Sequence, residues 1–136
     1  MFPLSIACGN TFILKPSERV ANSSIMLAEM IQEVGLPEGV FNLVHGGADT
    51  VTNICTNPDI RAISFVGGNA AGEYIWKTGT ANGKRVQCNM GAKNHAIVMP
   101  DAEKDDCINQ LIGACFGSSG QRCMAITTTV LVGDVK

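Results

Sequence analysis

The residues with the clearest chemical potential lie in a glycine- and serine-rich stretch near the end of the chain. Gly120-Gln121-Arg122-Cys123 places a cysteine directly after an arginine, and a neighbouring positive charge lowers the pKa of a thiol and favours its nucleophilic thiolate. The backbone N–H of Cys123 could also donate to an oxyanion formed by such an attack. The competing interpretation is a small buried hydrophobic residue, as most free cysteines are. Among the six cysteines of the chain, Cys123 is the best candidate for a nucleophile.

Lys15 and Glu18 form a second candidate site, just after the apolar run 11–14. That run predicts a short buried strand, and ligands of open α/β sheets bind beyond the carboxyl ends of the strands. A lysine and a glutamate there could grip a polar group of a ligand. The alternative is an ordinary solvated lysine followed by a glutamate that favours the start of a helix.

Gly67 and Gly68 stand where an expected strand meets an expected helix. Glycines at such a junction let the backbone come close to a ligand, and the N–H groups of a helix start attract phosphate. The spacing does not match the G-x-G-x-x-G pattern of dinucleotide-binding turns. A tight turn without a ligand therefore remains the alternative.

The stretch 89–95 holds the last candidate, His95, which would be its only titrating residue near neutral pH. A general base is one interpretation of His95, and a structural histidine beside a strand is the other. The only other histidine is His45, and neither histidine neighbours a pair of cysteines. The sequence therefore predicts no metal site.

These candidates lie between strands and helices that alternate along the chain. Apolar runs predict strands at 11–14, 40–44, 60–66, 85–89, 96–99 and 126–132, and helical periodicity predicts helices at 17–34, 49–56, 69–77 and 101–116. We expect Ser17 to cap the first helix, with Glu18 in its first turn, and Gly35 to end it. Short connections between alternating strands and helices favour parallel strands, so the fold class is α/β.

The composition excludes several classes of function. The 136 residues carry a formal charge of −2, which offers no electrostatic footprint for nucleic acid or an anionic membrane. The apolar runs are too short for a membrane-spanning helix. The cysteines are widely spread without a C-x-x-C pair, which favours reduced thiols in an intracellular protein, with Cys8, Cys88 and Cys115 as small buried residues.

Taken together, these segments resemble the aldehyde dehydrogenase superfamily, and its CoA-acylating branch in particular. The matching strings are MFPL at 1–4 with KPSE at 15–18, ISFVG at 63–67, NMGAKNH at 89–95 and GQRCM at 120–124, and the similarity covers essentially all 136 positions. The resemblance implies a Rossmann-like parallel sheet of the aldehyde dehydrogenase fold, incomplete in this chain. It also implies a partial NAD-binding domain at 1–90 and the start of a catalytic domain, with the nucleophile loop, at 91–136.

The resemblance assigns roles in cofactor binding to four residues. Lys15 and Glu18 would hold the hydroxyls of the adenosine ribose of NAD. Gly67 and Gly68 would lie at the pyrophosphate. Gly68 departs from the usual pattern, which has a serine at this position, so a hydroxyl is missing from the phosphate site and from the helix cap.

The resemblance also implies the reaction. Cys123 would attack the aldehyde carbonyl, and the thiohemiacetal would collapse to a thioester as hydride passes to NAD. Arg122 would pair with the carboxylate of a small semialdehyde substrate. Coenzyme A would then take the acyl group. For methylmalonate or malonate semialdehyde the products would be propionyl-CoA or acetyl-CoA, carbon dioxide and NADH, as in valine and pyrimidine catabolism.

Asn89 stands where hydrolytic members of the superfamily carry a glutamate that activates water. An amide cannot accept a proton at neutral pH, so water would be poorly activated. Asn89 therefore favours a thiol acceptor, in agreement with the acylating branch.

The resemblance further predicts that the chain is a fragment. Superfamily enzymes are several times longer, and their upstream oxyanion-hole asparagine, downstream nicotinamide-ribose glutamate and oligomerisation arm have no counterpart here. We therefore expect little or no turnover from the isolated chain, and a non-catalytic nucleotide-binding or subunit-interacting product is the alternative. The intact enzyme is expected to be a homo-oligomer without nucleic-acid or membrane partners. It is expected in the mitochondrial matrix of an animal or the cytoplasm of a bacterium, and we see no targeting segment in these residues.

Overall fold

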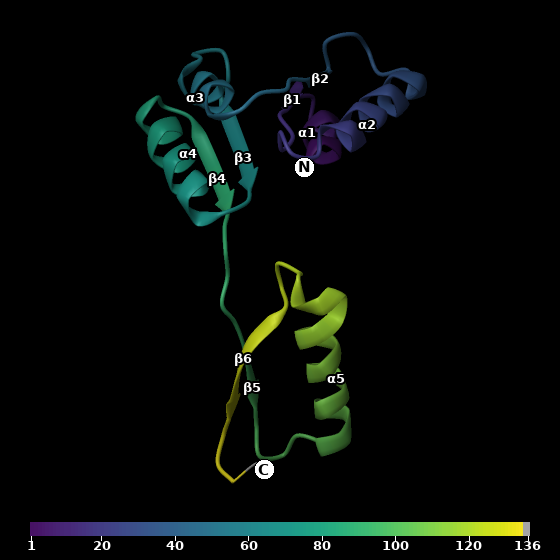
Figure 1. The fold of residues 1–136 in the computed structure, drawn as a ribbon, viewed down its shortest axis with the longest axis vertical. Coiled ribbons are helices and arrows are strands. Elements are labelled where there is room, and N and C mark those ends of the chain that lie inside the picture. Colours follow the sequence, from purple (N-terminus) through teal and green to yellow (C-terminus); the bar gives the residue numbers. More distant parts are fainter. Residues whose placement is uncertain (135–136) are drawn as a thin grey trace. The chain divides into compact units, whose positions relative to one another are not determined.

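The structure, a computed structural model, describes residues 1–134. The chain divides into two compact units, Met1–Asn89 and Met90–Lys136, and each is described by itself (Figure 1). Within residues 1–134, no helix is both long and apolar enough to cross a membrane.

The first unit alternates helices and strands. Its elements are α1 (Phe2–Ala7), β1 (Phe12–Leu14), α2 (Ala21–Val34), β2 (Phe41–Leu43), α3 (Ala48–Thr56), β3 (Ala62–Val66), α4 (Asn69–Ala81) and β4 (Arg85–Asn89). The second unit contains β5 (Asn94–Val98), α5 (Lys104–Phe116), the short 3₁₀ turn η1 (Gly117–Gly120) and β6 (Ile126–Leu131). The predicted order of strands and helices is confirmed, with shifts of a few residues at the element ends.

All the strands pair in parallel, as predicted, and the α/β class is confirmed. Among residues 1–134 the strands form three two-stranded sheets, β1–β2, β3–β4 and β5–β6, rather than one continuous sheet. Leu14 pairs with Leu43 and Val66 with Asn89. The carboxyl ends of β1 and β2 therefore lie together, as do those of β3 and β4.

The sequence analysis did not predict α1. Pro3 lies in the first turn of this helix, where a backbone N–H has no intrahelical partner, so the missing donor costs nothing. The ring of Phe2 packs against those of Phe12 and Phe41, with centroid distances of 6.2 and 5.4 Å. The apolar start of the chain thus covers the β1–β2 pair.

The predicted cap of the second helix was wrong. Helix α2 begins at Ala21 rather than after Ser17, and its N-cap Val20 makes no side-chain capping bond. The hydroxyl of Ser17 instead accepts a hydrogen bond from the Arg19 N–H at 3.3 Å, in a turn that Val20 N–H closes onto the Ser17 carbonyl at 3.2 Å. Such local bonds from serine compete with helix formation. Gly35 ends α2 in a left-handed conformation with φ 83°, as predicted.

The best-buried side chains of the first unit lie where α3 and α4 cover the β3–β4 pair (Figure 1). Cys55 is fully buried and Ile75 is 4% exposed. Lys84 is buried there too, and its ammonium donates to the carbonyls of Asn57 and Ile60, the second at 2.6 Å. This lysine fastens the turn before β3 to the start of β4.

The cysteines are free thiols, and their burial differs from the prediction in one respect. Cys8 is exposed, because it lies just beyond the end of α1 rather than inside an element. Cys88 and Cys115 are half-buried.

Candidate active site

Lys15 and Glu18 lie together at the carboxyl end of β1. The ammonium of Lys15 donates to the carbonyls of Pro16 and Gly46, the second at 2.8 Å, and it lies 3.9 Å from a carboxylate oxygen of Glu18. The Lys15 side chain is only 15% exposed, whereas that of Glu18 is 63% exposed. Lys15 therefore ties the loop after β2 to the end of β1, and Glu18 offers its carboxylate to the solvent beside it.

Gly46 is the partner of Lys15 that the sequence analysis did not single out. Its φ is 151°, and a Cβ atom added there would lie 1.8 Å from Oγ1 of Thr50. Only glycine fits this position. The glycine pair directly after a predicted strand was the signal that could have identified it.

Gly67 and Asn89 meet at the carboxyl ends of β3 and β4. The Gly67 N–H donates to the Asn89 carbonyl at 3.1 Å, and a Cβ at position 67 would lie 2.5 Å from the ring of Phe65. Gly68 is the N-cap of α4, with φ −73° and ψ 155°, and a Cβ there would meet nothing within 4 Å. The two residues before α4 therefore carry no side chain, which suits a phosphate-binding turn.

Cys123 lies in a turn between η1 and β6. Its side chain is exposed, so the interpretation of Cys123 as a core residue is wrong. The Ala125 N–H closes the turn by donating to the Arg122 carbonyl at 3.1 Å. The thiol is thus presented at a tight turn and is open to a reagent.

Arg122 folds back onto η1 beside the cysteine. Its Nε donates to the hydroxyl of Ser118 at 3.2 Å, and a Cβ at Gly117 would lie 3.1 Å from the guanidinium. Ser118 and Ser119 adopt left-handed backbone conformations, with φ 53° and 56°. Such conformations are costly for residues with a Cβ and are typical of functional loops.

Two other thiols are poor candidates for a nucleophile. Burial raises the pKa of Cys55, although the nearby Lys84 partly opposes the shift, and burial also raises the pKa of Cys88. Both thiols therefore stay protonated at neutral pH and lack the thiolate that attacks electrophiles. Cys8 and Cys123 are the exposed thiols, and Cys123 alone of these has a neighbouring arginine.

His95 is exposed on β5, and its Nδ1 lies 2.9 Å from the Lys93 carbonyl. The four expected cofactor residues and Asn89 belong to the first unit, whereas Arg122 and Cys123 belong to the second. Across residues 1–134, no cluster of three or more His, Cys, Asp or Glu side chains could hold a metal ion.

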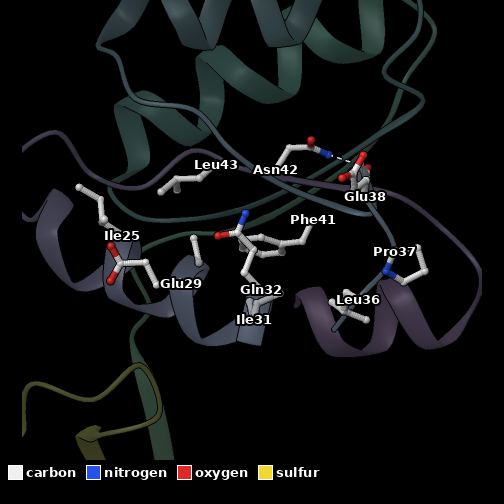
Figure 2. A pocket seen from close by; sticks show the side chains of 12 residues that line it. Ile25, Glu29, Ile31, Gln32, Leu36, Pro37, Glu38, Phe41, Asn42 and Leu43 are labelled. Atoms are coloured by element: carbon white, nitrogen blue, oxygen red, sulfur yellow. Dashed lines mark hydrogen bonds between the residues drawn. The ribbon is translucent and has the colours of Figure 1, made fainter. Parts of the chain in front are cut away.

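A hollow of about 500 Å³ lies between α2 and the segment 36–43, away from these candidates. Figure 2 shows its mixed lining, with the amide of Gln32 beside the ring of Phe41 and the carboxylate of Glu29 on the side of Ile25. Asn42 donates to the Gly39 carbonyl at 2.8 Å at its edge. None of the expected site residues lines this hollow.

Parallel strand pairs carry Lys15, Glu18 and the Gly67–Gly68 turn at their carboxyl ends, and an exposed cysteine lies in a glycine-rich turn. The chain belongs to the aldehyde dehydrogenase family, whose sequence profile matches residues 1–136. It is 59% identical over all 136 residues to the acylating mitochondrial methylmalonate-semialdehyde/malonate-semialdehyde dehydrogenase of Mus musculus, of which it covers 25%. The chain thus spans about a quarter of the length of the curated relatives it matches.

Two solved structures share its fold. One is the methylmalonate-semialdehyde dehydrogenase of Oceanimonas doudoroffii, with 54% identity and a TM-score of 0.89 over 98% of this chain and 28% of that one. The other is a Sinorhizobium meliloti 1021 protein assigned to the same enzyme and solved in complex with NAD. It has 54% identity and a TM-score of 0.89 over 98% of this chain and 27% of its own. The predicted family and fold are therefore confirmed.

Proposed function

We propose that these residues form part of the NAD site and supply the nucleophile of a CoA-acylating aldehyde dehydrogenase. The observation that carries the proposal is the exposed Cys123, directly after Arg122, in a chain 59% identical throughout to an acylating relative. The proposed substrates are methylmalonate and malonate semialdehyde. The proposed products are propionyl-CoA or acetyl-CoA, carbon dioxide and NADH.

The first unit is proposed to be part of the NAD-binding domain. Glu18 and Lys15 would hold the ribose hydroxyls, and the half-buried ammonium of Lys15 would keep the carboxylate of Glu18 at the strand end. Gly67 and Gly68 would face the pyrophosphate, because no Cβ separates their backbone from a ligand at the start of α4. NAD, when bound, supplies the acceptor for the hydride that leaves the substrate.

The second unit is proposed to be the start of the catalytic domain. The Cys123 thiolate attacks the aldehyde carbon, so a C–S bond forms and the carbonyl π electrons move to oxygen. The Cys123 N–H donates to that oxyanion. Loss of hydride from the carbon bonded to Sγ then gives the thioester. Arg122 pairs with the substrate carboxylate; when this group leaves as carbon dioxide, the electron pair of the broken C–C bond stays on the α carbon, which takes a proton from solvent. The thiol of coenzyme A then attacks the thioester carbonyl, and the bond to Sγ of Cys123 breaks.

Asn89 is proposed to select the acyl acceptor. Its side chain is exposed at the end of β4 and has no proton-accepting nitrogen or carboxylate. Water near it is not activated, so the thioester persists until coenzyme A arrives.

The intact protein is proposed to be a homo-oligomer. A mitochondrial location is proposed for an animal source, since the Mus musculus relative is named mitochondrial, and a cytoplasmic location for a bacterial source. The 136 residues alone are proposed to turn over little, because three-quarters of the relative's length has no counterpart in them.

The test is a chimera in which these 136 residues replace the matching quarter of the mouse relative. We expect NADH to form from methylmalonate semialdehyde only when coenzyme A is present, and Cys123→Ser to abolish it. Cys8→Ser is the matched control, because Cys8 is also exposed but has no assigned role. Turnover that survives Cys123→Ser would refute the assignment. Calorimetric titration of the 136-residue chain with NAD tests the first unit by itself.

A further inference from the structure

The turn that carries Cys123 is held by a side chain from the other end of the second unit. One amide nitrogen, Nδ2 of Asn94, donates to the carbonyl of Cys123 at 2.9 Å and to the carbonyl of Ala125 at 2.9 Å. Asn94 is half-buried and Ala125 is 4% exposed. The two N–H groups of a single amide thus bind the turn through the carbonyls on both sides of Met124.

Asn94 is itself fixed in place. It opens β5 and pairs with Ile126 of β6 (Figure 1), and the register shifts between Asn94 and His95. The hydroxyl of Thr127 donates to the Asn94 carbonyl at 3.2 Å. The backbone of Asn94 is therefore fixed by its pairing with Ile126 and by the bond from Thr127, so its side chain is a rigid support for the turn.

The geometry of the turn determines where the Cys123 N–H points. The peptide group that carries this N–H also carries the Arg122 carbonyl, which accepts from the Ala125 N–H inside the turn at 3.1 Å. Because a trans peptide directs its C=O and N–H in opposite directions, the Cys123 N–H points out of the turn. Among residues 1–134 it donates to no backbone carbonyl.

We propose that Asn94 is a positioning residue for the nucleophile, an inference that rests on the proposed role of Cys123. By holding the carbonyls at 123 and 125, Asn94 keeps Ala125 where it can close the turn. The thiol and the N–H of Cys123 then face the same reagent. Asparagine suits this task, because only a neutral amide presents two N–H donors on one nitrogen at this length.

Asn94 would make the same hydrogen bonds if it only stabilised the β5–β6 pair. The test must therefore separate this structural role from the positioning of Cys123. Acylation by p-nitrophenyl acetate passes through an oxyanion: the thiolate attacks the carbonyl carbon, a C–S bond forms, and p-nitrophenolate leaves with its electron pair. Alkylation by iodoacetamide passes through no oxyanion. The ratio of the two rates at one thiol therefore reports the N–H donor and cancels changes in exposure or thiolate fraction.

The experiment measures both rates at each cysteine of the 136-residue chain by peptide mass spectrometry at neutral pH. Cys8 is the internal reference, since it is exposed but its N–H already donates to the Leu4 carbonyl at 3.1 Å. We expect the acylation-to-alkylation ratio of Cys123 to exceed that of Cys8. Asn94→Ala and Asn94→Asp should each lower the Cys123 ratio about tenfold, less than the loss of a whole oxyanion donor.

Asn82→Asp is the matched control, because its Nδ2 also donates to a backbone carbonyl, that of Thr78 at 2.8 Å, in the first unit. It should leave the Cys123 ratio unchanged. If the acylation and alkylation rates at Cys123 fall by the same factor in the Asn94 variants, Asn94 has only a structural role and the proposal is wrong. A wild-type Cys123 ratio equal to that of Cys8 would instead overturn the role of Cys123, and the inference with it.

Discussion

Replacing the buried Lys84 by methionine should destabilise the first unit. Lys84 is 6% exposed, and its ammonium donates to the carbonyls of Ile60, at 2.6 Å, and Asn57. Methionine keeps the length and the apolar stem of the side chain but removes the donors. The turn before β3 then loses its tie to β4, while the packing around Cys55 and Ile75 stays filled.

The expected loss of stability follows from the two hydrogen bonds that Lys84 donates. A hydrogen bond from a charged donor contributes about 1.5–3 kcal/mol, so the pair contributes up to about twice that. Asn57 is exposed and Ile60 half-buried, so water can satisfy part of what the carbonyls lose. Removing a buried charge also relieves its desolvation cost. We therefore expect the free energy of unfolding to fall by about 2 kcal/mol.

The assay is urea denaturation followed by the fluorescence of Trp76, the only tryptophan of the chain, which lies on α4 of the same unit. With an m-value of about 1.5 kcal/mol/M, the midpoint should fall by about 1 M. Lys77→Met is the control, because Lys77 and its partner Glu73 are 70% and 61% exposed, and such surface pairs contribute close to nothing. Equal shifts in the two variants would refute the reasoning.

Three further substitutions probe the strand ends. Gly46→Ala should displace the loop that Lys15 holds, because the new Cβ would collide with Thr50, and NAD binding measured by calorimetry should weaken. Gly47→Ala is the control: its Cβ would meet nothing within 4 Å, so NAD binding should stay unchanged. Gly68→Ser should raise the free energy of unfolding by a few tenths of a kcal/mol, seen as a slightly higher thermal midpoint, because the backbone already has N-cap geometry and room for a side chain. In the chimera, Asn89→Glu should let NADH form without coenzyme A, and an unchanged dependence on coenzyme A would argue against Asn89 as the selector.

The strand ends were predictable because their signals are local. Apolar runs that stop at a lysine or a glycine pair located Lys15 and Gly67 at strand ends, and the alternation of elements predicted parallel pairing. In the structure Val66 pairs with Asn89, so Gly67 and Asn89 lie at the same edge.

The features that the sequence analysis missed depend on partners far along the chain. Lys84 is buried because it reaches carbonyls 24 and 27 residues earlier, and Asn94 reaches carbonyls 29 and 31 residues later. Neither residue has a local pattern that distinguishes it from a solvated polar side chain. The α1 helix was missed for a similar reason, since the ring of Phe2 packs on those of Phe12 and Phe41, which come later in the chain.

Three loops of the chain share one physical means of support. Lys15, Lys84 and Asn94 each donate from a side-chain nitrogen to backbone carbonyls of a distant loop. The ion pairs within residues 1–134, by contrast, are Lys15–Glu18 at 3.9 Å and the exposed Lys77–Glu73 at 3.5 Å. Bonds from shielded donors to carbonyls are screened by salt far less than exposed ion pairs. The geometry of these loops should therefore be set by a few buried nitrogens, and moderate salt should leave it unchanged.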